Sequence, residues 1–156
     1  MRVLFVCLGN ICRSPTAEAI FRQRLRAAGL DARVSVDSAG TGDWHLGKAP
    51  DPRTRDAALR RGYDLSALRG RQVGVEDFSS FDLVLAMDAR NLSHLQSLLP
   101  AAAPAEVDLF LRRYGLEPHE VPDPYYGGEQ GFEQVLDLIE RGCDGLLAEV
   151  EARLCT

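Results

Sequence analysis

The feature that most constrains this chain is a strand, a tight loop and a helix start, all within its first residues. Residues 3–6, Val-Leu-Phe-Val, are apolar and rich in β-branched and aromatic side chains, which predicts a buried strand. Ser14-Pro15 is typical of a helix start, where serine caps free amides and proline fits the first turn. The intervening loop therefore lies at a helix N-terminus. Backbone N–H groups and the helix dipole converge there and favour binding of an anion.

The chemistry of this loop comes from a thiol at its start, Cys7, and a guanidinium at its end, Arg13. Helix amides and an arginine stabilise a thiolate, which can attack phosphorus directly. The planar guanidinium matches two phosphate oxygens. The loop lacks the glycines and the Lys-Ser/Thr pair of an ATP-binding loop, so we interpret it as the phosphate site of a cysteine-dependent phosphatase. The alternative is a buried structural cysteine beside a surface arginine.

Two residues inside the loop suit this purpose. Gly9 lets the backbone approach a ligand closely, and Asn10 is one of the few non-glycine residues that tolerate a left-handed turn. We therefore expect the backbone of the loop to curl around the bound anion.

Composition limits what the rest of the molecule can be. The chain has 156 residues, which suits a single domain spanning residues 1–156. A net charge of −5, from 18 basic and 23 acidic side chains, argues against a nucleic-acid-binding protein. No apolar run approaches about 20 residues, so we expect no membrane span. The N-terminus lacks the pattern of a secretory signal, which favours a cytoplasmic location.

The chain contains four cysteines: Cys7, Cys12, Cys143 and Cys155. In a chain of this size without a secretory signal we expect them to be reduced thiols. We expect no metal site, because there is no C-x-x-C motif and the three histidines lie far apart. Cys143 falls on the apolar face of the last helix, which predicts an inert core thiol. Cys155 follows that helix and is interpreted as incidental.

Strand and helix patterns alternate along the chain, which indicates one doubly wound α/β domain. We predict strands at residues 3–6, 33–37 and 107–111, and a further strand within 82–88 that runs into a helix cap. We predict helices at residues 15–28, 51–61, 92–99 and 131–154. The expected sheet is four-stranded, parallel and flavodoxin-like, with order 2-1-3-4 and helices on both faces. Ligands of such sheets bind beyond the carboxyl ends of the strands where the order reverses, and the first strand delivers Cys7 there.

Two further segments carry side chains suited to an aryl phosphate. Asp123 lies between prolines in Val-Pro-Asp-Pro-Tyr-Tyr, where an acid could protonate the departing oxygen and Tyr125 and Tyr126 could stack on a ring. The alternative is an ordinary turn aspartate. Trp44 lies in a glycine-rich loop at residues 38–50. It either contacts a ligand or packs the loop onto the body of the protein.

The run Cys7-Leu-Gly-Asn-Ile-Cys-Arg-Ser-Pro resembles the signature loop of the low-molecular-weight protein tyrosine phosphatases, and Asp123-Pro-Tyr-Tyr is similar to the general-acid loop of that family. The resemblance implies a Cys7 nucleophile, an Arg13 phosphate clamp, an Asp123 acid and base, and a Ser14 hydroxyl that donates to the Cys7 sulfur. The implied phosphate loop comprises Leu8, Gly9, Asn10, Ile11, Cys12, Arg13 and Ser14. The implied pocket walls are Trp44, Tyr125 and Tyr126.

The same resemblance implies phosphotyrosine-containing proteins as substrates and inorganic phosphate as product and inhibitor, with no metal or organic cofactor. Two positions depart from patterns in related proteins. Leu68 stands where relatives often have a histidine that braces the loop asparagine, so the bracing of Asn10 must differ. Ile11 stands where arginine phosphatases tend to have threonine, which favours phosphotyrosine over phosphoarginine.

Three other functions remain as alternatives. A protein arginine phosphatase shares the fold and mechanism. An arsenate reductase on the same fold needs further cysteines near the third strand, and residues 60–100 contain none. A non-catalytic phosphotyrosine-binding module would not need both Cys7 and Asp123.

Cys12 has two interpretations of its own. The first is a small apolar filler under the loop. The second is a resolving thiol that captures an oxidised Cys7 as a reversible disulfide.

Overall fold

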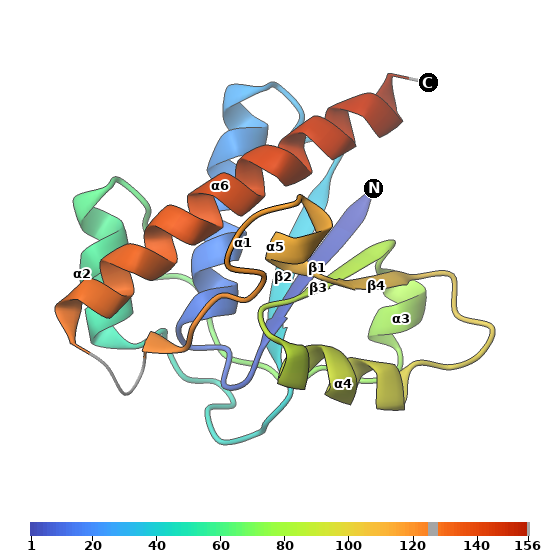
Figure 1. Cartoon of the computed structure of the whole chain (residues 1–156), viewed down its shortest axis with the longest axis horizontal. Coiled ribbons are helices and arrows are strands. Elements are labelled where there is room, and N and C mark those ends of the chain that lie inside the picture. Colours follow the sequence, from blue (N-terminus) through green and yellow to red (C-terminus); the bar gives the residue numbers. More distant parts are fainter. Residues whose placement is uncertain (125–127, 156) are drawn as a thin grey trace.

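The structure, a computed structural model, describes residues 1–124 and 128–155 (Figure 1). Its sheet is formed by β1 (Arg2–Cys7), β2 (Ser35–Gly40), β3 (Leu83–Ala86) and β4 (Glu106–Leu109). The strands are parallel and lie in the order β2-β1-β3-β4. The helices are α1 (Arg13–Ala27), α2 (Pro52–Arg60), α3 (Asp77–Ser80), α4 (Ala89–Leu98), α5 (Phe110–Arg113) and α6 (Glu129–Leu154). The predicted four-stranded parallel sheet and its order are confirmed.

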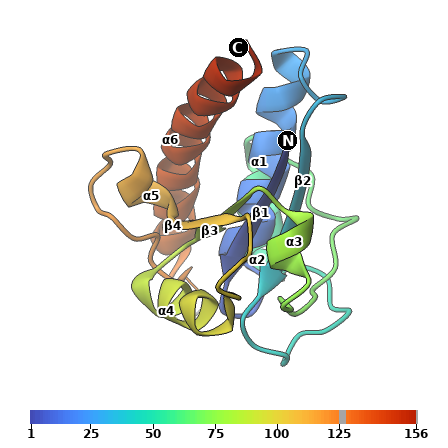
Figure 2. The ribbon, with the colours of Figure 1, turned by 90° about the vertical axis from the view of Figure 1, so that its right-hand side faces the viewer.

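Helices cover both faces of the sheet because its central strand is apolar on both sides. Val3 and Phe5 of β1 belong to the same buried cluster as side chains of α1 and α6. Leu4 and Val6 point the other way and pack with side chains of α3 and α4. A fully buried parallel strand requires such a continuous apolar run. Figures 1 and 2 show α6 lying across α1, with α4 on the opposite side of the sheet.

Several helix boundaries follow the predicted capping signals. Asp51 is the N-cap of α2, where its side chain accepts the Arg53 amide. Asp88 is the N-cap of α4 and forms a reciprocal capping box with Asn91. Helices α1 and α2 end next to Gly29 and Gly62, both of which have positive φ, as expected for the residue that follows a helix.

The start of α1 differs from the prediction. The helix begins at Arg13 with Cys12 as its N-cap, and no side chain caps it. Ser14 was expected to be the cap, but its hydroxyl is instead hydrogen-bonded inside the loop next to Cys7. The capping pattern in the sequence does not show that the buried side chains of Cys7 and Asn10 compete for the Ser14 hydroxyl.

Three further differences come from tertiary contacts. Strand β2 is displaced toward Gly40, because six consecutive residues pair with β1 despite their modest strand propensity. The fourth strand ends at Leu109 rather than at residue 111. Phe110 opens the short helix α5, and its ring packs edge-on against Phe5 at a centroid distance of 5.3 Å. The sequence interpretation also missed α3 and α5, each of which has four residues.

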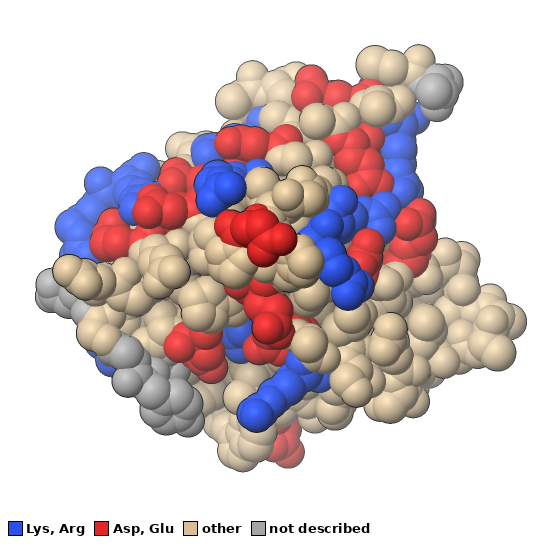
Figure 3. All heavy atoms as spheres, in the orientation of Figure 1, with Lys and Arg blue, Asp and Glu red and all other residues tan. Residues whose placement is uncertain are grey.

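No helix in the described ranges is both long and apolar enough to cross a membrane. On the face seen in Figure 3, acidic and basic side chains alternate over α6 and near β4, and neither sign dominates. Many of them are paired, as in the contacts of Arg113 with Glu106 and Glu149.

Candidate active site

The site lies where the sheet order reverses, between the carboxyl ends of β1 and β3. Strand β1 ends at Cys7, and the chain continues through the loop into α1. Strand β3 ends at Ala86 and leads to Asp88 at the start of α4. Because β1 and β3 are parallel neighbours, their carboxyl ends are adjacent. The end of β1 at Cys7 and the start of α4 at Asp88 therefore lie at the edge for which the site is predicted.

The Cys7 sulfur is nearly buried and is hydrogen-bonded within the loop. The residue is 3% exposed. The backbone nitrogen of Asn10 lies 3.3 Å from Cys7 Sγ, and the Ser14 hydroxyl oxygen lies 3.0 Å from the same sulfur. A thiolate can only accept, so Ser14 would donate to it, and both groups stabilise the charged sulfur.

Asn10 holds the curvature of the loop. It has a positive φ of 58°, as the sequence predicted. Its Nδ2 group donates to Ser14 Oγ at 2.8 Å and to Ser38 Oγ at 3.0 Å. Its Oδ1 atom accepts the Arg71 amide at 3.0 Å. Leu68 packs against the main core, and the backbone of Arg71 takes the bracing role expected of a histidine.

A second layer of polar groups holds Asn10 in turn. Ser38 donates to Glu18 Oε1 at 2.7 Å, and Arg22 donates to Glu18 Oε2 at 2.8 and 3.0 Å. Burial raises the pKa of Glu18, and the hydrogen bonds from Ser38 and Arg22 oppose that shift. Arg71 contacts Asp37 and Asp77 through its side chain. Because these partners lie on separate elements, the loop is fixed from α1, β2 and the segment before α3.

Arg13 is held by acidic and backbone groups on the far side of the loop. Its Nη1 donates to Asp88 Oδ2 at 2.7 Å and to the Val121 carbonyl at 2.9 Å, while Nη2 lies 3.6 Å from Asp123 Oδ2. Burial opposes the guanidinium charge, but the Cys7 sulfur and the hydrogen bond to Asp88 outweigh it and raise the pKa of Arg13. The sequence interpretation treated Asp88 only as a helix cap and missed this second contact.

A cavity of about 350 Å³ opens above these groups. The residues that line it are Cys7, Leu8, Gly9, Ile11, Cys12, Arg13, Trp44, His45 and Asp123. The structure thus brings together the predicted cysteine, arginine, aspartate and tryptophan. Tyr125 and Tyr126, also predicted for the pocket walls, lie outside the described residues.

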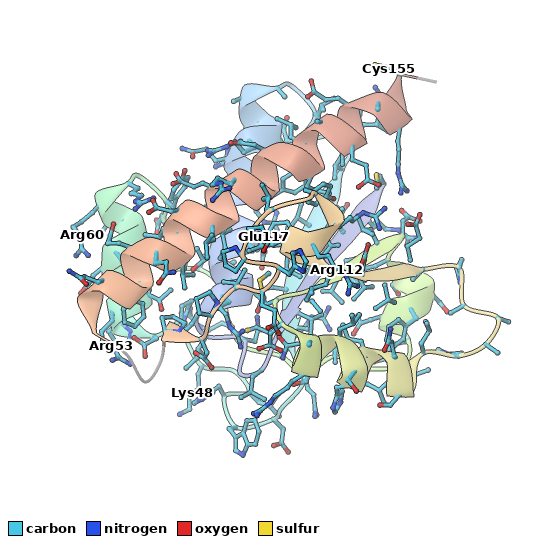
Figure 4. The ribbon with its side chains drawn as sticks, viewed as in Figure 1. Lys48, Arg53, Arg60, Arg112, Glu117 and Cys155 are labelled. Atoms are coloured by element: carbon cyan, nitrogen blue, oxygen red, sulfur yellow. The ribbon has the colours of Figure 1, made fainter. Side chains whose placement is uncertain are left out.

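Trp44 is 65% exposed at the mouth of the cavity. Its ring lies over Gly42, where any side chain would collide with it, so the glycine allows the loop to fold back. His45 follows in the same loop and lies against Gly9, where a Cβ atom would be 2.9 Å from the imidazole. No pattern in the sequence marked His45 as a lining residue. Lys48, labelled in Figure 4, lies farther along this loop, and its backbone pairs with Gly70.

The other three cysteines differ from one another in burial. Cys12 is 5% exposed, and burial raises the pKa of its thiol to about 12. Cys143 is fully buried, which raises its pKa further, and its thiol lies 3.8 Å from the Ala17 carbonyl. Cys155 is exposed. Within the described ranges, no group of three or more histidine, cysteine or acidic side chains could hold a metal ion.

Comparisons with known proteins agree with this geometry. A family model described as low molecular weight phosphotyrosine protein phosphatase matches residues 2–154. A low molecular weight protein-tyrosine-phosphatase of Streptomyces coelicolor is 47% identical over 159 residues, which cover 98% of this chain and 95% of that protein. A crystal structure of a protein tyrosine phosphatase from Entamoeba histolytica is 39% identical and superposes with a TM-score of 0.92 over 97% of each chain.

A crystal structure of an arginine phosphatase from Drosophila is 33% identical, with a TM-score of 0.90, and the match covers 96% of this chain and 98% of that one. The family match spans nearly the whole sequence and includes both the cysteine loop and the aspartate segment. The chain therefore belongs to the low molecular weight phosphotyrosine protein phosphatases, a family of hydrolases.

Proposed function

We propose that this protein hydrolyses phosphotyrosine in protein substrates through a phosphocysteine intermediate, with residues 1–156 acting as one catalytic domain. The observation that carries the proposal is the convergence of three groups on one cavity. Cys7, Arg13 and Asp123 all line it, and Arg13 Nη2 lies 3.6 Å from Asp123 Oδ2. No metal or organic cofactor is needed for the steps that follow.

In the first step, the Cys7 thiolate attacks phosphorus, an S–P bond forms, and the P–O bond to the tyrosine ring breaks. Arg13 and the amides of residues 8–14 bind the equatorial oxygens, where charge is concentrated during phosphoryl transfer. Asp123 donates its proton to the departing phenolate. A positive, rigid loop suits this step, because the loop needs little rearrangement when negative charge shifts on the transferring phosphoryl group.

In the second step, a water molecule attacks the phosphocysteine. Asp123, now a carboxylate, accepts the water proton while the S–P bond breaks and the thiolate is released. Inorganic phosphate leaves the loop as product, and it should bind there as an inhibitor. The Ser14 hydroxyl, 3.0 Å from Cys7 Sγ, lowers the free energy of the thiolate in both steps.

The walls of the cavity support an aryl substrate. Trp44, Leu8 and Ile11 offer apolar surface above the phosphate site, and we assign Tyr125 and Tyr126 to the same role. Burying one ring among such side chains contributes about 1–3 kcal/mol. The shorter side chain of phosphoserine would leave its phosphorus above the sulfur.

Two variants test the mechanism. Cys7→Ser should abolish turnover while phosphate still binds, because the loop amides and Arg13 remain. Asp123→Ala should slow aryl phosphates with poor leaving groups more than those with good ones, because good leaving groups need little protonation. Equal slowing across leaving groups would remove Asp123 from the acid role.

A protein arginine phosphatase is the second candidate, and the likeness to the Drosophila arginine phosphatase is the observation that favours it. Ile11 lines the cavity and supports phosphotyrosine instead. Rates with p-nitrophenyl phosphate, a phosphotyrosine peptide, phosphoarginine and arsenate separate the two candidates and also test for arsenate reductase. Turnover of phosphoarginine as fast as phosphotyrosine would contradict the tyrosine assignment.

For Cys12 we propose a packing role. A resolving thiol reacts as its thiolate, and burial holds the pKa of Cys12 at about 12. The redox alternative predicts that peroxide-treated wild type recovers activity with reductant far better than Cys12→Ser. Equal recovery would support packing.

A further inference from the structure

The segment that carries Asp123 is attached to the junction between β3 and α4. The Val121 amide donates to the Met87 carbonyl at 2.8 Å, and the Val121 carbonyl accepts from Arg13 at 2.9 Å. These bonds fix Val121, which is completely buried. They do not hold the backbone before Val121, and the path of that backbone also affects where Asp123 lies.

Glu120 provides the missing attachment. Its Oε2 atom accepts the Ala89 amide at 2.6 Å. Ala89 is the first residue of α4, a ten-residue helix, so its amide has no partner within the helix. The positive end of the helix dipole also favours a carboxylate at this point. Asp88 accepts the Asn91 amide, so the two carboxylates satisfy different amides of the same helix start.

Three consecutive residues of this junction therefore contact the catalytic groups or their supports. Met87 binds the Val121 amide, Asp88 binds the Arg13 guanidinium, and Ala89 binds Glu120. Residues 87–89 thus contact both the phosphate clamp and the segment that carries the acid.

Glu120 is exposed, and its carboxylate contacts the Ala89 amide. It forms no salt bridge with any arginine, lysine or histidine of the described residues. Its neighbour Glu117 pairs with His119 at 2.9 Å and has a side chain that is 81% exposed (Figure 4).

We propose that Glu120 is a positioning residue, which holds the segment of Asp123 against the start of α4 so that the acid reaches the leaving oxygen. The inference rests on the proposed function, in which Asp123 is the acid. Glu120 does not touch the substrate. It acts by fixing the backbone three residues before Asp123.

The test compares Glu120→Ala, Glu120→Gln and the matched control Glu117→Ala. Each is assayed with phenyl phosphate, which has a poor leaving group, and with a nitrophenyl phosphate, which has a good one. Glu120→Ala should lower kcat/KM for phenyl phosphate by about two- to fivefold, the range that one helix-terminus hydrogen bond supports. This ratio covers only the steps up to release of the phenol, so the later role of Asp123 as a base does not affect it. The kcat/KM for nitrophenyl phosphate and the inhibition constant of inorganic phosphate should stay within about twofold of wild type.

Glu120→Gln keeps an acceptor for the Ala89 amide and should restore most of the phenyl phosphate rate. Glu117→Ala should behave as wild type with both substrates. A loss in Glu117→Ala equal to that in Glu120→Ala would overturn the inference, since the effect would then belong to any change in the segment. A parallel loss of phosphate binding would also overturn it, because Glu120 would then support Arg13 rather than Asp123.

Asp123→Ala, assayed in parallel, separates the inference from the proposed function. If Asp123→Ala shows the leaving-group dependence and Glu120→Ala does not, the positioning role is wrong and the acid assignment stands. If neither shows it, the acid assignment has failed and the inference fails with it. Thermal melting of each variant identifies any loss of rate that is due to unfolding.

Discussion

Asp88 contacts both the phosphate clamp and the first turn of α4. One carboxylate oxygen accepts from Arg13 at 2.7 Å, and the other accepts the Asn91 amide at 2.8 Å. The side chain is 21% exposed, whereas Arg13 is 3% exposed. The orientation of the buried Arg13 guanidinium therefore depends on Asp88, for which the local sequence predicts only a role as a helix cap.

Asp88→Ser should separate these two contacts. Serine is a good N-cap, so the melting temperature should change little, but Arg13 loses a partner that orients it. We expect kcat to fall about tenfold, a cost of about 1.4 kcal/mol in orienting the transferring phosphoryl group. Phosphate inhibition should change less, because removal of a neighbouring negative charge offsets the loss of orientation.

Asn91→Ala is the matched control for that experiment. It removes the reciprocal half of the capping box without touching Arg13. The melting temperature should fall, by an amount that corresponds to about 1 kcal/mol, while kcat stays near the wild-type value. If the two variants lose activity equally, the helix start, and not the ion pair, positions the clamp.

Trp44→Ala tests the wall of the pocket. Because Trp44 is 65% exposed in the free protein, a bound aryl ring can cover it. We expect kcat/KM for a phosphotyrosine peptide to fall about tenfold, while inhibition by phosphate, which occupies only the floor, is unchanged. Leu59→Ala is the control, since Leu59 is 62% exposed on α2 and does not line the cavity. If peptide turnover and phosphate inhibition weaken together, Trp44 supports the loop rather than the substrate.

At the scale of elements, an ion-pair network joins α6 to α5 and β4. Arg113 donates to both oxygens of Glu149 at 2.8 and 2.9 Å, and Tyr114 donates to the same carboxylate at 2.8 Å. These hydrogen bonds lower the pKa of Glu149 to about 2, and the contribution of Arg113 is the largest. A carboxyl group with a depressed pKa in the folded state stabilises the protein above its unfolded pKa and loses that contribution as it is protonated.

Glu149→Gln should therefore lower the free energy of unfolding at pH 7 by about 1–2 kcal/mol, with solvent screening taken into account. The difference from wild type should shrink as the pH falls from about 5 towards 2, through the range between the unfolded and folded pKa values. Urea unfolding at several pH values measures this. Glu151→Gln is the control, because Glu151 is exposed on the same helix. A difference that does not depend on pH would exclude the network as its source.

At the scale of the whole molecule, burial separates Cys12 and Cys143 from Cys155. Cys143 and Cys12 belong to the main core, and burial raises the pKa of each. Cys155 is exposed. In native protein at pH 8, excess iodoacetamide should modify Cys155 while Cys12 and Cys143 resist, because the reagent needs an accessible thiolate.

Mass spectrometry of digested protein measures this modification site by site. All four cysteines should react once the protein is unfolded in urea, which provides the control for reagent access. Rapid native labelling of Cys12 would contradict its packing role, since it would require an accessible thiolate at that position.

Local sequence patterns were sufficient for the framework of this protein. Each signal lies within one continuous segment of the chain: the apolar run of β1, the capping residues Asp51 and Asp88, and the apolar face of α6. Their periodicity and end signals predicted the alternating strands and helices, and the confirmed sheet order agrees with them. The motifs around Cys7 and Asp123 marked all three groups that meet at the cavity, because Arg13 closes the first motif.

Tertiary structure alone decided how those groups are held. Asn10 is braced by Ser38 and by the Arg71 amide, and Arg13 by Asp88, yet no local pattern links residues so far apart in the chain. The same applies to Glu120 on the first amide of α4. Such contacts depend on which strands become neighbours and in what register, because a parallel sheet brings distant carboxyl ends together only after its order is set.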